Sequence, residues 1–375
     1  MFNNLRELIA TMPDEKTCRD YVIKERWNGN VTCPYCGFNK YYVIEGGKRF
    51  KCGTKPCLRK FSVTVGTFME DSNIAISKWL TAIYLCTAHK KGISSYQLAK
   101  DIGISQKASW FMLHRIRNKM LPKIEKKLDN IIEADLTFIG GSISNKSNTV
   151  RKEYLKNKNA FANKTSVLGI TERQGNTIMK VVPQNEERQV DKLVRDNIEL
   201  AANVITDEGS PFNGLNDNYS HHRVNHSKNE YARLHFHTNS IEGVFSHFKR
   251  MVYGIYHQIS NKHTQQYLNE FTYRFNTREL KDADRFSLTM KNLEGRLTYK
   301  ELIAVKEPAP KTVRVKMQNG EDKRKAVIQL QDGVITGEFE SLNDAMRKTG
   351  IDAGSISKAI SGKQKTAGGY KWIFA

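Results

Sequence analysis

Three acidic residues occur where side chains from separate elements could hold a pair of divalent metal ions. Asp135 lies in the apolar, strand-like segment IIEADLTFI, Asp207 ends the strand-like segment NVITD, and Glu242 lies at the start of the helix-like segment NSIEGVFSHFKR. Carboxylates arranged in this way can bind two Mg²⁺ or Mn²⁺ ions, which stabilise the attacking and leaving oxygens when a phosphodiester is cut. Lys249, two helical turns after Glu242, could contact a neighbouring phosphate, and Asn239 could cap the helix or assist the metal site.

Each acid also has a structural interpretation that involves no metal. Alternation places Glu133, Asp135 and Thr137 on one face of their strand. A carboxylate in an apolar strand is costly to bury unless a charge lies opposite, and that charge could be an arginine or lysine. Glu242 could simply stabilise the start of its helix, where acids are favoured. The three acids taken together favour the metal site.

Two cysteine pairs predict a zinc site near the amino terminus. Cys33 and Cys36 are separated by two residues, and Cys52 and Cys57 by four. Two such knuckles on short hairpins form a zinc ribbon, in which four thiolates hold Zn²⁺ tetrahedrally. Because four thiolates leave no open position, the Zn²⁺ would be structural and would stabilise a segment with little apolar mass. The alternative is four structurally unrelated cysteines.

The charge of the chain favours a polyanionic partner. Among 375 residues, 60 Lys and Arg outnumber 39 Asp and Glu, which gives a net charge of +21. This excess favours DNA, although general solubility or a membrane surface could also use it. The sequence has no membrane-spanning run or signal peptide, so we expect a cytoplasmic, nucleoid-associated protein without a membrane partner. Cysteines stay reduced there, so Cys18 and Cys86, which lack partners at metal spacing, are expected to be core thiols.

The segment SSYQLAKDIGISQKASWFMLHRIRNKM predicts two helices joined by a tight turn. Gly103 allows the turn, and Ser105 is a typical cap for the second helix. The second helix would bury one side and present the other to DNA, as in a helix-turn-helix. Its predicted DNA contacts are Lys107, His114 and Arg117. An ordinary helical hairpin is the alternative.

Together these motifs resemble a known enzyme family. The CPYCG knuckle, FSVTVGTFMEDSNIAISKW, the TDEG strand end and HTNSIEGVFSHFKRMVYGIYH resemble DDE-type insertion-sequence transposases of the ISXO-two-like (IS fifteen-ninety-five) family. The resemblance covers roughly residues 5–285 and implies that Asp135, Asp207 and Glu242 are the catalytic acids. Many relatives carry a second acid after the first aspartate, where this chain has Leu136, a residue not expected to bind metal.

The resemblance also implies a reaction and its partners. The protein would cut DNA at the ends of an insertion sequence and join the freed 3′-OH ends to target DNA by two-metal catalysis. Lys249 and Asn239 would belong to the catalytic site with the three acids, and Lys249 and Arg250 would contact the DNA. The zinc ribbon and helix-turn-helix would recognise terminal inverted repeats, and a homodimer or higher oligomer would assemble on DNA. Two other functions stay open: a DNA-binding regulator without the reaction, and a nuclease that cuts without joining.

Residues 326–375 are expected to form a small separate module. Their pattern predicts a strand, a helix over Leu342–Thr349, a turn at Gly350, a second helix and a closing strand. The stretches SLNDAMRKTGI, SISKAISGK and TAGGYKW resemble the NUMOD-type DNA-binding modules of homing nucleases. That resemblance implies that Lys358 and Lys363 face DNA. The alternative is a stabilising or protein-binding cap.

The predicted architecture is therefore α/β and multidomain. The catalytic part is expected to be ribonuclease-H-like, with a mixed sheet flanked by helices, and the last module to be α+β. The expected order is an N-terminal helical segment at 1–30, the zinc ribbon at 31–66, the helix-turn-helix at 67–124, the catalytic domain at 125–285, a linker at 286–325 and the C-terminal module at 326–375.

Overall fold

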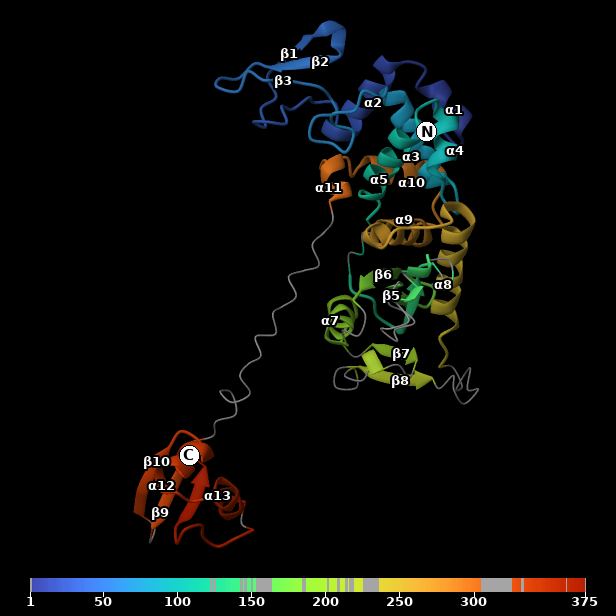
Figure 1. The fold of residues 1–375 in the computed structure, drawn as a ribbon. Coiled ribbons are helices and arrows are strands. Elements are labelled where there is room, and N and C mark those ends of the chain that lie inside the picture. The colour runs from blue at the N-terminus through green and yellow to red at the C-terminus, as the bar shows by residue number, and fades with distance from the viewer. Residues whose placement is uncertain are drawn as a thin grey trace. The chain divides into compact units, whose positions relative to one another are not determined.

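A computed structural model divides the chain into two units, Met1–Ala304 and Val305–Ala375 (Figure 1). The structure describes residues 2–121, 124, 126–141, 144, 147–149, 151–152, 164–183, 187–200, 202–207, 210–212, 215, 219–224, 236–304, 326–331, 334–361 and 363–374. Within these ranges, no helix has the length and apolar character needed to cross a lipid bilayer.

The amino-terminal part of the first unit combines a small sheet with a group of helices (Figure 1). The sheet is antiparallel, with the order β1-β2-β3. Its strands are β1 (Tyr41–Ile44), β2 (Arg49–Cys52) and β3 (Lys60–Phe61). The helices are α1 (Leu5–Thr11), α2 (Glu15–Trp27), α3 (Ile76–Ala88), α4 (Ser95–Ile102) and α5 (Gln106–Arg117).

One hydrophobic core joins this sheet, these helices and a later part of the chain. Phe61 of β3 and Phe286 of α10 (Asp282–Met290) are both buried in it. Cys18 and Cys86 are also fully buried in this core, which confirms the prediction that they are core thiols. The three predicted N-terminal segments therefore share one core and depend on each other for stability.

The predicted turn between α4 and α5 is confirmed. Gly103 ends α4 in the left-handed region at φ 62°, which a residue with a Cβ rarely adopts. The hydroxyl of Ser105 accepts a hydrogen bond from the Ala108 amide at 3.2 Å and caps α5. The helix pair therefore forms where the sequence predicts it.

Residues 286–304 belong to the first unit, which corrects the predicted linker at 286–325. Met290 and Leu293 are buried in the N-terminal core, and the Phe68 amide donates to the Leu293 carbonyl at 3.1 Å. The short helix α11 (Tyr299–Ile303) follows. Phe286, Met290 and Leu293 are spaced by four and three positions, as on one face of a helix, and this spacing was the available signal for a packed segment. The remainder of the predicted linker, 305–325, lies outside the described residues.

A mixed sheet of five strands forms the second half of the first unit, as the predicted α/β class requires. The order is β6-β5-β4-β7-β8; β5 runs antiparallel to β4 and β6, and β7 runs parallel to β4 and β8. The strands are β4 (Ile131–Ile139), β5 (Thr165–Glu172), β6 (Thr177–Val182), β7 (Asn203–Asp207) and β8 (Ser220–Val224).

Helices cover the two faces of this sheet. Helix α7 (Glu187–Asn197) packs on the face that carries Ile132. Helices α8 (Asn239–Met251) and α9 (Thr264–Asn276) share a core with Val167 on the opposite face (Figure 1). The described residues of this part also form the short helical turns η3 (Ser210–Phe212), η6 (Val252–Tyr256, π-helical) and η7 (Asn261–His263).

The second unit has its own small core. The sheet is antiparallel with the order β10-β9-β11, and Trp372, Ile356 and Ala345 are buried against it. The helix predicted over Leu342–Thr349 is confirmed, and Gly350 ends it at φ 73°. The elements are β9 (Val327–Gln331), β10 (Val334–Phe339), α12 (Leu342–Thr349), α13 (Ala353–Ile360) and β11 (Lys371–Phe374).

Candidate active site and metal centre

Asp135 and Asp207 lie side by side on two neighbouring parallel strands. The last registered pair of β4 and β7 is Ala134 with Thr206, so the two aspartates are the next residue of each strand. Neighbouring strands are about 4.8 Å apart, and residues at the same register point to the same face. Both aspartates are partly exposed. The register therefore brings two of the three predicted acids together.

The face that carries these aspartates is the one covered by α8. Asp135 pairs with Gly169 of β5, and Gly169 pairs with Met179 of β6. Paired residues share a face, and Met179 packs in the same core as Ile241 and Phe245 of α8. Asp135 therefore projects to the side of the sheet on which α8 lies.

Gly169 allows α8 to approach the sheet beside Asp135. A Cβ on Gly169 would lie 2.6 Å from Phe245 Cε1 and 2.7 Å from Ile241 Cδ1. Contacts that short do not occur in packed proteins, so α8 rests on bare backbone here. Glu242 directly follows Ile241, so this close approach also determines where Glu242 lies.

The start of α8 is held by a carboxylate from the sheet. Glu133 of β4 is fully buried, and it accepts hydrogen bonds from the Ser240 amide at 2.8 Å and the Ile241 amide at 3.0 Å. The Ser240 hydroxyl donates to the same carboxylate at 2.9 Å. Arg173 donates to Glu133 through Nε at 2.7 Å and to the His237 carbonyl at 3.0 Å.

Glu242 is exposed in the first turn of α8. The Thr238 hydroxyl donates to its carboxylate at 3.2 Å. Asn239 is the first residue of the helix and is exposed; the N-cap position is Thr238, which makes no side-chain cap hydrogen bond. The prediction that Asn239 caps the helix is therefore wrong, because Glu133 takes that role. Its contribution to a metal site stays a prediction.

Two basic residues extend the same helix. Lys249 is partly exposed and lies two turns after Glu242, on the same side of α8. Arg250 is exposed, and its Nη2 donates to the Ser246 hydroxyl at 3.1 Å. Both side chains can therefore be reached from solvent, as a DNA contact requires.

Asp135, Asp207 and Glu242 lie on adjoining elements, but their carboxylate oxygens do not all lie within 4.8 Å of one another. Within the described part of the chain, the four cysteines alone form a gathered group of three or more possible metal ligands. Like charges disfavour close approach of carboxylates to one another. Metal binding by Asp135, Asp207 and Glu242 therefore stays a prediction that their elements support.

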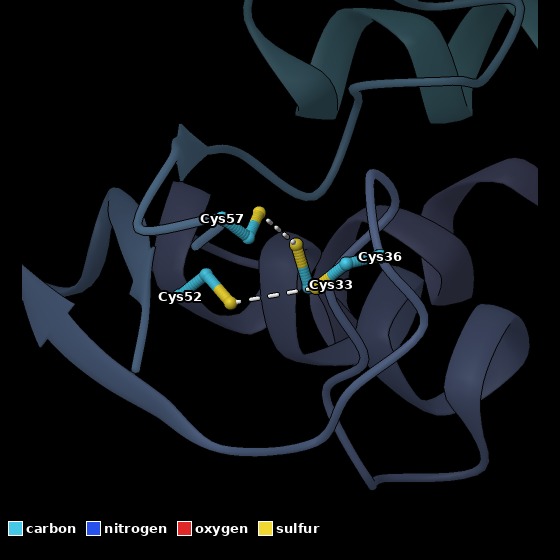
Figure 2. Close-up of side chains that lie close together, drawn as sticks. All are labelled: Cys33, Cys36, Cys52 and Cys57. Atoms are coloured by element: carbon cyan, nitrogen blue, oxygen red, sulfur yellow. Dashed lines mark hydrogen bonds between the residues drawn. The ribbon is translucent and has the colours of Figure 1, made fainter. Parts of the chain in front are cut away.

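The four predicted zinc ligands converge at one point, as Figure 2 shows. Sγ of Cys33 lies 3.8 Å from Sγ of Cys57, and Sγ of Cys36 lies 3.6 Å from that of Cys52. Zinc bound tetrahedrally at about 2.3 Å requires sulfur atoms about 3.8 Å apart. All four sulfur atoms lie within 4.8 Å of one another, so the arrangement fits a structural Zn²⁺.

Two residues predicted to contact DNA are buried, which corrects their assignment. The Arg117 side chain is fully enclosed, and its Nε donates to Glu270 of α9 at 2.5 Å. His114 is also fully buried, and its Nδ1 donates to Gln266 Oε1 at 2.5 Å. The side of α5 that the sequence suggested for DNA instead packs against α9. The α5–α9 interface therefore replaces the predicted DNA contact.

A buried charge cluster lies at this interface. Glu270 accepts hydrogen bonds from Arg117, from Arg274 at 2.5 Å and from the Tyr256 hydroxyl at 2.6 Å. Burial alone would raise the pKa of Glu270, but Arg274 and Arg117 outweigh it and lower that pKa to about 2. Burial, reinforced by Arg117, lowers the pKa of His114 to about 2.

The other basic residues predicted to bind DNA are accessible. Lys107 on α5 is exposed, with its Nζ 5.6 Å from the centre of the Tyr299 ring. Lys358 and Lys363 of the second unit are exposed as well. Exposure permits a phosphate contact, and the contact itself stays a prediction.

Two fully buried acids that organise the first unit, Glu133 and Glu270, had no predicted role. A signal existed for Glu133, since it lies two residues before Asp135 on the same face of an apolar strand. Its partner Arg173 follows β5 directly. For Glu270, the spacing of four residues from Arg274 on one helix was the available signal.

Comparisons with known proteins match both halves of this architecture. The model of the ISXO2-like transposase domain matches residues 127–276, and that of the transposase zinc-ribbon domain matches residues 13–59. An uncharacterized transposase-like protein of Haemophilus influenzae is 30% identical over 102 residues, which cover 27% of this chain and 81% of that protein. The chain belongs to the ISXO2-like transposase family. Its acids and its cysteine cluster thus lie inside domains of that family.

Two further relatives differ in how much they share with this family member. An uncharacterized protein in the transposable element ISH50 of Halobacterium salinarum is 23% identical over 280 residues, 71% of this chain and 92% of that protein. An uncharacterized HNH endonuclease of Acanthamoeba polyphaga mimivirus is 48% identical over 54 residues, only 14% of each chain. The first likeness spans most of the transposase, and the second is confined to a short stretch.

Proposed function

We propose that this chain is an active DNA transposase. It would bind the terminal inverted repeats of its insertion sequence, cut at the element ends and join the 3′-OH ends to target DNA. The proposal is carried by the adjacent register of Asp135 and Asp207 on the face that α8 covers, within a transposase-family domain. The strand order β6-β5-β4-β7-β8 supports a ribonuclease-H-like assignment for this sheet.

Asp135, Asp207 and Glu242 are suitable ligands for Mg²⁺ or Mn²⁺. Both ions prefer carboxylate oxygens, and each of the three acids is at least partly exposed, so a phosphate could share the ions. Asp135, Asp207 and Glu242 would hold the metals. When bound, such a pair of ions stabilises both the attacking and the leaving oxygen of an in-line phosphoryl transfer.

The other residues of the site would position DNA. Lys249 and Arg250 lie on the helix that carries Glu242, so their charges can neutralise phosphates next to the scissile bond. Asn239, exposed at the start of that helix, can donate to or accept from a phosphate or a metal-bound water.

End recognition is proposed for the amino-terminal part and the second unit. The zinc ribbon and the exposed Lys107 would contact the inverted repeats, while Lys358 and Lys363 would add contacts from a NUMOD-like module. The net charge of +21 supports a DNA partner. We further propose a homodimer or larger assembly on paired ends, acting on the cytoplasmic nucleoid.

The experiment that tests the proposal incubates the purified chain and Mg²⁺ with duplexes carrying the ends of its element and a supercoiled target plasmid. We expect cleavage at the ends and joined products. Asp135→Asn should abolish both reactions while leaving binding of the end duplex unchanged. Cleavage by the Asn variant would refute the assignment of Asp135.

The same assay distinguishes the two other functions. Cleavage without joined products would identify a nuclease. Binding without cleavage, in Mg²⁺ and in Mn²⁺, would identify a regulator that has kept the fold and lost the reaction.

A further inference from the structure

We infer that Glu133 is a positioning residue for the metal site, because it fixes the start of α8 on the sheet and so holds Glu242 beside Asp135 and Asp207. The inference rests on the proposed function and adds to it a residue that touches neither metal nor DNA. It also explains why the carboxylate of Glu133 is fully buried in the sheet.

The first step is that α8 lacks a cap of its own. The side chain of Thr238, at the N-cap position, makes no cap hydrogen bond. The amides of Ser240 and Ile241, which have no acceptor inside the helix, donate instead to Glu133 at 2.8 and 3.0 Å. A carboxylate at this end of a helix is also favoured by the helix dipole. Glu133 therefore supplies from the sheet the cap that α8 lacks.

The second step is that this cap fixes position as well as stability. Glu133 and Asp135 are two residues apart on one face of β4, and Glu242 follows directly the Ile241 amide that Glu133 holds. Any shift of the helix start relative to β4 would therefore move Glu242 relative to Asp135. Among the described residues, one strand, one set of hydrogen bonds and one helical turn link these three acids.

The third step is that Arg173 holds both partners of the contact. It lies just after β5, its Nε donates to Glu133, and its guanidinium also donates to the carbonyl of His237, just before α8. The His237 ring lies 3.5 Å from the Glu133 carboxylate. Arg173 therefore provides a counter-charge for the buried Glu133 and ties down the segment that enters α8.

The test compares Glu133→Gln with Thr171→Val in the full chain. Thr171 pairs directly with Glu133 across β4 and β5, is equally buried, and loses its hydrogen bond to Thr177 in the variant. Thr171→Val therefore controls for damage to the same strand pair. The probe is Mn²⁺ alone, measured by the electron paramagnetic resonance of the free ion, together with hydrogen exchange of the Ser240 and Ile241 amides.

We expect Glu133→Gln to weaken Mn²⁺ binding about tenfold, as for other residues that orient metal ligands. Both amides should exchange about tenfold faster, since the carboxamide offers one acceptor oxygen to the four donors that the two carboxylate oxygens of Glu133 accept from. Thr171→Val should change neither quantity more than about twofold, even where it lowers overall stability as much.

Two further variants keep the test decisive if Glu133→Gln folds poorly. Ser240→Ala removes only the hydroxyl contact and should weaken Mn²⁺ binding slightly, about threefold. Arg173→Gln keeps the oxygens of Glu133 but removes its counter-charge and the tie to the His237 carbonyl, so it should also weaken Mn²⁺ binding. Weaker Mn²⁺ binding in both of these variants than in Thr171→Val supports the inference.

The outcomes separate the inference from the function on which it rests. If Glu133→Gln and Ser240→Ala bind Mn²⁺ as tightly as Thr171→Val and the wild type do, the positioning role alone is overturned. A wild type whose Mn²⁺ binding is unaffected by Asp135→Asn would contradict the proposed metal site and the inference with it.

Discussion

Gly169 lies directly opposite Asp135 in the antiparallel pairing of β4 and β5, and α8 rests on it. Phe245 and Ile241 of the helix occupy the space that a side chain at position 169 would need. The spacing between the sheet and the helix that carries Glu242 thus depends on a glycine whose backbone needs no unusual φ. Steric room, rather than conformational freedom, is what this glycine provides.

Gly169→Ala should therefore reduce DNA cleavage more than it reduces stability. The added Cβ would meet ring atoms of Phe245 at 2.6 and 2.8 Å, so α8 must shift outward and carry Glu242 with it. A displacement of about 1 Å can cost on the order of 100-fold in rate. The measurement is the single-turnover cleavage rate, together with the free energy of unfolding in urea.

A matched control lies on the helix itself. The Cβ of Gly243→Ala would meet nothing within 4 Å, so this variant should be neutral or slightly stabilising, by about 0.5–1 kcal/mol. Phe245→Leu, combined with Gly169→Ala, frees space at the clash and should restore part of the rate. A Gly169→Ala enzyme with full activity would show that the spacing of α8 is irrelevant to the reaction.

Replacement of a zinc ligand should destabilise the helices around the zinc ribbon as well as the ribbon itself. Cys33→Ser is expected to reduce bound zinc from about one ion per chain to near zero, because three thiolates hold it far less tightly. Cys33 and Cys52 belong to the core that also contains α2, α3 and α10, so the thermal midpoint should fall. Zinc content by atomic absorption and calorimetry check this.

Cys18→Ser is the corresponding control. Cys18 is as deeply buried as Cys52 but lies outside the cluster, with its thiol 3.8 Å from the Met12 carbonyl. Its variant should keep full zinc content. Normal zinc in Cys33→Ser would exclude that cysteine as a ligand.

Features that depend on residues close in sequence were predicted better than features that depend on long-range contacts. The cysteine pairs, the Gly103 turn with its Ser105 cap and the helix at Leu342–Thr349 all depend on residues close in sequence, and the structure confirms them. Such features are determined by spacing and backbone preference, which a single sequence displays.

The errors arose where a distant segment decides the environment. His114 and Arg117 lie on a polar side of α5, and in isolation that side looks like a solvent-facing one. Contacts with α9, such as those of Arg117 with Glu270 and of His114 with Gln266, 153 and 152 positions away, make it an interior surface. The role of Glu133 similarly depends on amides 107 and 108 positions further along the chain. The hydrophobic periodicity of one segment does not indicate which distant residue its polar side chains contact.

Glu270→Gln should destabilise the first unit strongly. The change leaves Arg117 and Arg274 buried without a counter-charge, which typically costs about 3–5 kcal/mol. Urea unfolding at pH 7.5 measures it. Glu45→Gln removes an exposed ion pair with Arg49 and should cost less than about 1 kcal/mol. Equal effects of the two variants would show that the buried cluster contributes nothing beyond a surface pair.

Acidification should weaken the α5–α9 interface well before carboxylates protonate. Burial lowers the pKa of His114 to about 2 and that of His263 to about 4, from an ordinary value of 6.5. Their ring centroids are 4.6 Å apart with the ring planes tilted by 45°, and Arg117 lies close to both. Below pH 6.5 the unfolded chain binds protons that the folded chain refuses, so stability present above pH 6.5 is lost as the pH falls.

At pH 5 each of these histidines should cost about 2 kcal/mol of folding stability relative to pH 7.5. His114→Gln removes one of the two groups and keeps a side chain that can donate to Gln266. The loss of stability between pH 7.5 and 5, measured by urea unfolding, should therefore shrink by about 2 kcal/mol in this variant. An unchanged pH dependence would mean that His114 titrates in the folded chain as it does in water, and that α5 leaves α9 often enough to admit a proton.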